Sequence, residues 1–147
     1  MPMDLDAIVF DIGGTLVAEA APGTPVAELR VNFIGDVVAD LEQLASSVRL
    51  GAATDTSVMI EADVRALLEP SGVSALLDAI VTSVDVGAKK PDPASLNAVI
   101  ARLGVTDPSR VLFVGDKEID RQAAAAAGTH FAWAHQDGAL ASVSAYL

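Results

Sequence analysis

Polar side chains follow short apolar runs at several separate points of the chain, and this pattern limits the fold most strongly. Asp11 directly follows the apolar residues 7–10, Thr54 directly follows residues 49–53, and Asp116 comes after residues 111–114. Such short, continuous apolar runs are typical of strands buried on both faces of a parallel sheet. The carboxyl ends of parallel strands share one edge of the sheet, so we expect these polar groups to lie together.

Segments with helical spacing alternate with the apolar runs. In residues 26–44, for example, Phe33, Val37, Leu41 and Leu44 fall on one face of a helix. The sequence predicts helices over residues 26–44, 58–68, 94–103 and 119–127, and further strands over residues 80–82 and 131–133. Strands that alternate with helices predict an α/β fold with a parallel sheet between two helical layers. No linker or repeat interrupts the chain, so residues 1–147 are predicted to form a single domain.

Composition excludes several classes of function. The formal net charge of −11 argues against binding to nucleic acid and to anionic membranes, both of which attract clustered Lys and Arg. The absence of cysteine removes disulfides and thiolate chemistry. The acidic start of the chain and the lack of an apolar run of ~20 residues predict a cytoplasmic protein without a transmembrane helix. The apolar composition is compatible with a homodimer, although no interface stripe is visible.

Asp11 and the following glycines form the first candidate site. A carboxylate at the end of a buried strand can act as a nucleophile or a metal ligand. Gly13 and Gly14 would let backbone N–H groups approach an anion closely. The alternative is an Asp that only caps a turn.

Thr54, Asp55 and Lys90 are candidate phosphate-binding groups. The Thr54 hydroxyl and the Asp55 N–H could each donate to a phosphate oxygen, and Lys90, stiffened by Pro91, could bring a positive charge to a phosphoryl group. Thr54 could instead begin a turn, and Lys90 could be an ordinary exposed loop lysine.

Asp116 and Asp120 are candidate Mg²⁺ ligands. They lie four residues apart, at a strand end and one turn later. Mg²⁺ favours a few carboxylates and keeps several waters, which suits this arrangement. Asp116 could also cap the helix that follows, and the two roles are compatible.

Together these residues resemble the four motifs of the haloacid dehalogenase superfamily, in the right order. Residues 10–16 resemble the first motif, in which Asp, any residue, Asp, Gly and Thr follow an apolar strand. Thr54 resembles the second motif and residues 90–93 the third. Residues 114–116, together with Asp120, resemble the fourth. One such match is weak, but four in order are specific.

The resemblance implies a three-layer α/β/α, Rossmann-like fold and a Mg²⁺-dependent phosphohydrolase that works through a phospho-aspartyl intermediate. The substrate would be a phosphorylated compound of unknown identity. By resemblance, the catalytic residues are Asp11, Thr54 and Lys90; the phosphate-binding residues are Gly13, Thr54, Asp55 and Lys90; and the metal ligands are Asp11, the Gly13 carbonyl, Asp116 and Asp120. Asp120 could instead orient Lys90.

Gly13 departs from the family pattern. Phosphatases of the family usually have a second Asp at this position, which protonates the leaving group and then activates water. The loss of general acid–base assistance costs ~10²–10⁴ in rate, so weak or specialised activity is expected. Glu19, Asp55 or Glu118 could substitute, and the sequence does not distinguish among them.

The spacing between the motifs is the second departure. Only 43 residues separate Asp11 from Thr54 and 36 separate Thr54 from Lys90, so no separate cap domain is expected and the site should be open. A catalytically impaired module that binds Mg²⁺, phosphate or a protein partner is therefore the alternative function. A zinc site at His130 and His135 is a weaker possibility, since strand-end or surface histidines are commoner.

Overall fold

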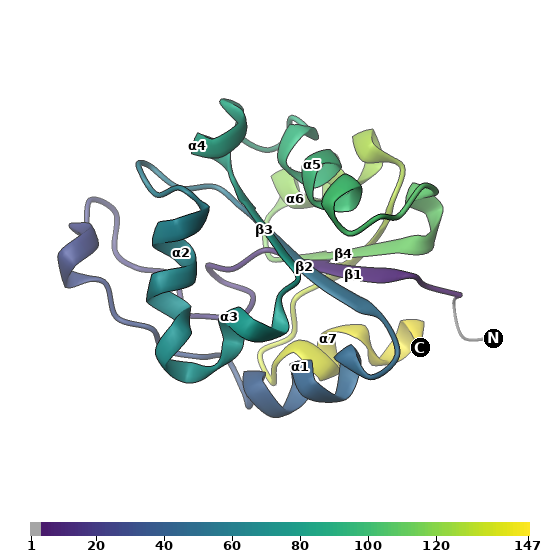
Figure 1. Ribbon diagram of the computed structural model, residues 1–147, viewed down its shortest axis with the longest axis horizontal. Coiled ribbons are helices and arrows are strands. Elements are labelled where there is room, and N and C mark those ends of the chain that lie inside the picture. Colours follow the sequence, from purple (N-terminus) through teal and green to yellow (C-terminus); the bar gives the residue numbers. More distant parts are fainter. Residues whose placement is uncertain (1–3) are drawn as a thin grey trace.

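The computed structural model describes residues 4–147 and places a five-stranded sheet at the centre of the molecule (Figure 1). All strand pairs are parallel, in the order β3-β2-β1-β4-β5. The strands are β1 (Ala7–Phe10), β2 (Arg49–Thr54), β3 (Ala79–Thr82), β4 (Val111–Gly115) and β5 (His130–Trp133). All five predicted strands are confirmed, with small changes at their ends.

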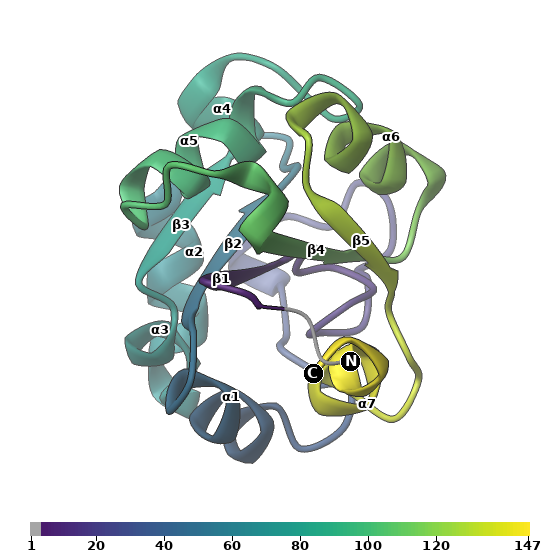
Figure 2. The ribbon, with the colours of Figure 1, turned by 90° about the vertical axis from the view of Figure 1, so that its right-hand side faces the viewer.

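Helices cover both faces of the sheet. The α-helices are α1 (Val37–Ala45), α2 (Glu61–Leu68), α3 (Val73–Leu76), α4 (Ser83–Val86), α5 (Ala94–Arg102), α6 (Glu118–Ala127) and α7 (Ala139–Val143). Short 3₁₀ helices are η1 (Val26–Glu28), η2 (Glu69–Ser71), η3 (Pro108–Arg110) and η4 (Ser144–Tyr146). Figures 1 and 2 show α5 and α6 on one side of the sheet and α1 and α7 on the other. The predicted three-layer α/β/α fold is thus confirmed.

The two faces of β1 explain the continuous apolar run. Ile8 and Phe10 belong to the core shared with α1, α2, α3 and α7, whereas Ala7 and Val9 belong to the core shared with α5 and α6. Successive side chains of a strand point to opposite faces, so a strand between two helical layers must be apolar at every position. All four β1 residues are fully buried.

The helix predicted over residues 26–44 is wrong for its first half. The chain forms only η1 there, and α1 begins at Val37, where Asp36 accepts a hydrogen bond from the Ala39 N–H at 3.3 Å. Phe33 instead pairs with Val17 in an isolated antiparallel bridge. Gly35 has a φ of 75°, which interrupts a helix. This tertiary pairing overrides the helical spacing.

Smaller corrections concern the helix ends. The helix predicted to begin at residue 58 starts at Glu61, and a short helix, α4, lies where no helix was predicted. Helix α7, near the end of the chain, was not predicted. Thr82 explains α4, because its side chain accepts from the Asp85 N–H and the Asp85 carboxylate accepts from the Thr82 N–H. Within residues 4–147, no helix is long and apolar enough to cross a membrane.

Candidate active site

Asp11 lies at the carboxyl end of the central strand. Phe10 pairs with Ala52 of β2 and Val114 of β4, and the Asp11 N–H donates to the Val114 carbonyl at 2.9 Å. The chain then turns sharply, with the Leu16 N–H donating to the Ile12 carbonyl at 2.9 Å. The Asp11 side chain is therefore held, largely buried, at the edge where the strands end.

Lys90 reaches Asp11 from the loop after α4. Its Nζ lies 3.1 Å from Asp11 Oδ1 and 2.7 Å from Asp120 Oδ1, and donates to the Ala53 carbonyl at 3.2 Å. The Lys90 N–H donates to Asp55 Oδ1 at 3.2 Å. Only 5 % of Lys90 is exposed, so the alternative of an ordinary loop lysine is wrong. A buried ammonium between two carboxylates has a fixed position.

Three carboxylates converge beside this lysine. Asp11, Asp116 and Asp120 each offer an oxygen within 4.8 Å of the others. Asp116 Oδ1 is buried and lacks a hydrogen-bond partner. A Cβ at Gly14 would lie 2.0 Å from Asp116 Oδ2, so the glycine lets the carboxylate pack against the turn. An unpartnered oxygen in a carboxylate cluster suits a hard divalent cation such as Mg²⁺, and the residues present fit this ion.

The cluster carries more negative than positive charge, and the pKa values reflect this. Burial raises the pKa of Asp11 to about 7; Lys90 opposes the shift, and Asp120 and Asp116 add to it. Burial likewise raises the pKa of Asp116. Burial alone would lower the pKa of Lys90, but Asp11 and Asp120 outweigh it and the pKa is raised. Lys90 is thus a permanent cation, and a bound metal ion would stabilise the ionised Asp11.

One Asp120 oxygen accepts backbone hydrogen bonds, and the other forms an ion pair with Lys90 but has no hydrogen-bond partner. Asp120 Oδ2 accepts from the Asp116 N–H at 3.1 Å and the Lys117 N–H at 3.0 Å, and its Oδ1 faces Lys90. These contacts favour the positioning of Lys90 over direct metal ligation. Direct ligation by Asp120 stays a prediction.

Thr54, Gly13 and Asp55 complete the site. With Asp11 and Lys90 they line one small cavity of about 50 Å³ at the sheet edge. Thr54 ends β2 and is buried. The structure therefore brings together every predicted phosphate-binding residue. His130 and His135 lie outside the acidic cluster, and His135 Nδ1 faces Asp137 at 3.5 Å.

Glu19 and Lys117 also reach this cavity. A Cβ built on Gly13 would lie 3.6 Å from Glu19 Cγ and 3.9 Å from its Oε1, so Glu19 borders the space that a side chain at position 13 would enter. Lys117 Nζ forms an ion pair with the Glu19 carboxylate. Glu19 was one of three carboxylates that could not be distinguished from the sequence, and Lys117 was not predicted because its only signal is its place beside Asp116.

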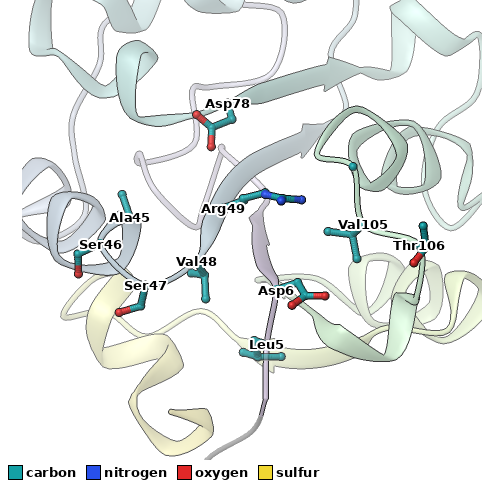
Figure 3. Close-up of a pocket in the computed structure, with 11 residues that line it drawn as sticks. Leu5, Asp6, Ala45, Ser46, Ser47, Val48, Arg49, Asp78, Val105 and Thr106 are labelled. Atoms are coloured by element: carbon teal, nitrogen blue, oxygen red, sulfur yellow. The ribbon is translucent and has the colours of Figure 1, made fainter.

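Larger cavities lie outside the small one, including one beside it and one at the opposite end of the sheet. A groove of about 490 Å³ adjoins the small cavity and shares Gly13, Glu19, Thr54 and Asp55 with it. Another cavity, of about 540 Å³, is lined by Asp6 and Arg49 (Figure 3). These two residues precede or begin strands, so this cavity is at the amino ends of the sheet, away from Asp11. It holds none of the predicted site residues.

Residues 24–134 match the family of haloacid dehalogenase-like hydrolases. The chain belongs to this family. The matched stretch contains Thr54, Lys90, Asp116 and Asp120, whereas Asp11 and Gly13 precede it.

Phosphatases are among the relatives with similar sequence. The chain is 40% identical over 84 residues to phosphoglycolate phosphatase from Salmonella typhi, which covers 57% of this chain and 32% of that protein. It is 42% identical over 62 residues to pyrophosphatase PpaX from Bacillus velezensis, covering 42% of this chain and 28% of that protein. The chain thus spans about a third of the length of these curated relatives.

Solved structures share the fold at low sequence identity. A HAD-superfamily hydrolase from Ehrlichia chaffeensis superimposes with a TM-score of 0.72 at 16% identity, covering 89% of this chain and 88% of that one. The 2-haloacid dehalogenase from Pseudomonas syringae gives a TM-score of 0.69 at 18% identity, with 88% and 86% covered. Both likenesses concern the fold alone.

Proposed function

We propose that the chain is a Mg²⁺-dependent phosphohydrolase that transfers the phosphoryl group to Asp11 and then to water. One observation carries this proposal: Asp11, Lys90 and Thr54 line a single small cavity next to an unpartnered Asp116 oxygen. The phosphatases among its relatives support the same reaction class.

The chain's own residues provide the parts of this reaction. An Asp11 oxygen attacks phosphorus, the bond to the leaving-group oxygen breaks, and water then hydrolyses the acyl phosphate. Lys90 Nζ, fixed by Asp120, orients Asp11 and offers positive charge to the phosphoryl oxygens. Thr54 is placed to donate to the same oxygens.

A bound Mg²⁺ would offset the charge between Asp11 and an anionic substrate. Asp11, Asp116 and the Gly13 carbonyl are the groups that would hold it. Its presence would also relieve the mutual repulsion of the carboxylates, which is part of what raises the pKa of Asp11.

Proton transfer to the leaving group is the weak point of the site, because Gly13 has no side chain. Among the three carboxylates that could substitute, Asp55 Oδ1 accepts from the Lys90 N–H, and Glu118 bonds to Arg121 at 2.9 Å. Glu19 is also paired, with Lys117, but of the three it is the one within 4 Å of a Cβ built on Gly13. We therefore expect Glu19 to supply part of the missing function, and substrates with good leaving groups to react best.

Turnover of p-nitrophenyl phosphate tests the proposal, because its good leaving group needs no acid. We expect Mg²⁺-dependent release of p-nitrophenol that Asp11→Asn reduces to background. If wild type and Asp11→Asn give equal rates with Mg²⁺ present, the chain does not hydrolyse such esters. The alternative of a module that binds Mg²⁺, phosphate or a protein would then be preferred.

A further inference from the structure

An apolar groove leads away from the phosphate cavity. One wall is the loop before α1, which contributes Val17, Val26 and Leu29, and the other includes Val58 and Met59. Figure 1 shows this loop and α2 on the same side of the molecule. The groove measures about 490 Å³, against about 50 Å³ for the phosphate cavity.

The two cavities are neighbours with a shared wall. Gly13, Glu19, Thr54 and Asp55 line both, so a group attached to a phosphate beside Asp11 would extend directly into the groove. Val58 is 66 % exposed and Val26 is 45 % exposed, although both are large apolar side chains. Exposed apolar surface that continues from a polar site is typical of ligand-binding grooves.

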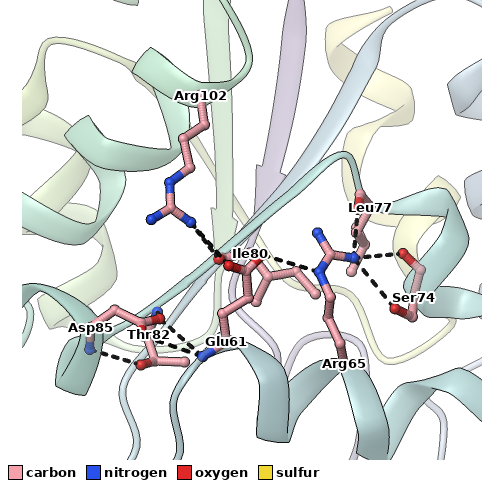
Figure 4. Close-up of polar contacts among 8 residues, drawn as sticks. All are labelled: Glu61, Arg65, Ser74, Leu77, Ile80, Thr82, Asp85 and Arg102. Carbon is pink, nitrogen blue, oxygen red and sulfur yellow. Dashed lines mark hydrogen bonds and ion pairs between the residues drawn. The ribbon is translucent and has the colours of Figure 1, made fainter.

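Helix α2 forms a fixed wall of the groove. Arg65 Nη1 donates to the Ser74 and Leu77 carbonyls at 3.0 and 3.2 Å, which ties α2 to the segment before β3 (Figure 4). Glu61 of the same helix pairs with Arg102 of α5 at 3.3 Å. Val64, Leu67 and Leu68 line the groove from this anchored helix.

The charged groups in the lining limit what the groove can hold. Glu19 and Asp55 stand at its inner end, next to the phosphate cavity. Arg30 is the basic residue of the lining, and its Nη1 already donates to the Leu29 carbonyl at 3.0 Å. A carboxylate on the leaving group would meet two acids and apolar walls, which disfavours it.

We propose that this groove binds the leaving group of a phosphate monoester, and that this group is an uncharged, apolar aryl alcohol, which departs without a general acid. The inference rests on the proposed function, because it assumes that phosphate binds beside Asp11. It also predicts a difference from relatives that are phosphoglycolate phosphatases, since glycolate is small and anionic. At the inner end of the groove, Lys117 is already paired with Glu19 and Lys90 with Asp11 and Asp120, so these cations are committed to protein carboxylates.

Two aryl phosphates with leaving groups of similar acidity test the inference. With Mg²⁺, kcat/KM for 1-naphthyl phosphate should exceed that for phenyl phosphate by about tenfold, because the second ring is buried against apolar walls. Phosphoglycolate should be a poorer substrate than either. Equal kcat/KM for the two aryl esters, or a preference for phosphoglycolate, would overturn the proposal while leaving the phosphohydrolase function in place.

Variants at exposed positions of the groove separate this role from folding. Val58→Asp and Val26→Asp should reduce the naphthyl-to-phenyl ratio toward one. Val84→Asp is the matched control, because Val84 is 39 % exposed in α4 and lies outside the groove lining. If Val58→Asp leaves the ratio unchanged but dissociates a dimer in sedimentation, the groove is an interface between two copies and the proposal is wrong.

A binding measurement distinguishes failure of the groove from failure of catalysis. By calorimetry in the presence of Mg²⁺, 1-naphthylmethylphosphonate should bind about tenfold more tightly than methylphosphonate. Val58→Asp should remove the difference. If neither aryl ester is hydrolysed but this difference is present, the proposed function fails and the groove stands; equal binding of the two phosphonates would refute the groove.

Discussion

Placing a carboxylate at position 13 is the sharpest test of the proposal that the site lacks a general acid. Gly13 does not have a positive φ, so an L residue fits its backbone. Its new Cβ would lie 3.6 Å from Glu19 Cγ, an ordinary van der Waals contact. Gly13→Asp should therefore fold and place a carboxyl group beside Asp11 and Glu19.

The expected gain follows from the acid that the site lacks. General acid–base assistance contributes ~10²–10⁴ in rate, or about 3–5 kcal/mol of activation free energy. Alkyl phosphates have poor leaving groups that need a proton, so kcat/KM for an alkyl phosphate should rise by about this factor in Gly13→Asp. The rate with p-nitrophenyl phosphate should change much less, because its leaving group departs as the anion.

The assay is steady-state kinetics of both esters with Mg²⁺, with Gly14→Ala as the control. Gly14 has a φ of 81°, and its Cβ would lie 2.0 Å from Asp116 Oδ2, so this variant should lose activity toward both esters. If Gly13→Asp folds, hydrolyses p-nitrophenyl phosphate at the wild-type rate and shows no gain with alkyl phosphates, the missing acid does not limit the reaction. That result would refute the reasoning from Gly13.

Three further predictions concern the buried charges and the metal. Lys90→Met should lower the free energy of unfolding by about 3–5 kcal/mol in urea denaturation, because it leaves Asp11 and Asp120 without their buried cation. Lys89→Met, at an exposed position, is the control and should change this free energy little. Equal losses in the two variants would contradict this account. Folding raises the pKa of Asp11 from 3.8 to about 7, so the folded protein favours the protonated carboxyl group. Without Mg²⁺, the free energy of unfolding should therefore fall by up to about 4 kcal/mol as the pH rises from about 4 to about 7. Lys90 stays charged across this range, and Asp116, whose pKa burial also raises, still titrates in Asp11→Asn, so this variant should show a shallower fall than the wild type. Millimolar Mg²⁺ should raise the Tm of the wild type more than that of Asp116→Asn, and equal shifts would argue against Asp116 as a ligand.

Local sequence pattern predicted the sheet well. The runs at residues 7–10 and 111–114 are apolar at every position because both faces of each strand are buried, and this leaves little choice of element. The order of elements then requires a parallel sheet, so the gathering of Asp11, Thr54 and Asp116 at one edge follows from the sequence. Pro91 indicated that Lys90 has a stiffened position, but the burial of Lys90 was not predicted.

Helical spacing was less reliable where tertiary contacts compete with it. Residues 26–36 carry apolar side chains at helical intervals, yet Phe33 pairs with Val17 and Gly35 takes a positive φ. The helical spacing of apolar residues shows only which side chains are apolar. An extended segment over a groove can bury the same side chains as a helix. Helix α7 is only five residues long, so its pattern was too short to detect.

By itself, the sequence determined the family of the fold and the nucleophile candidate and placed a glycine at position 13, because each depends on a residue type at a fixed place relative to a strand. Only the tertiary structure decided that Glu19 borders Gly13, that Lys117 pairs with Glu19, and that Asp120 is engaged by backbone donors. The apolar groove likewise exists only because the loop before α1 packs opposite α2. These features join residues far apart in the chain, and their distances depend on packing, which no local pattern encodes.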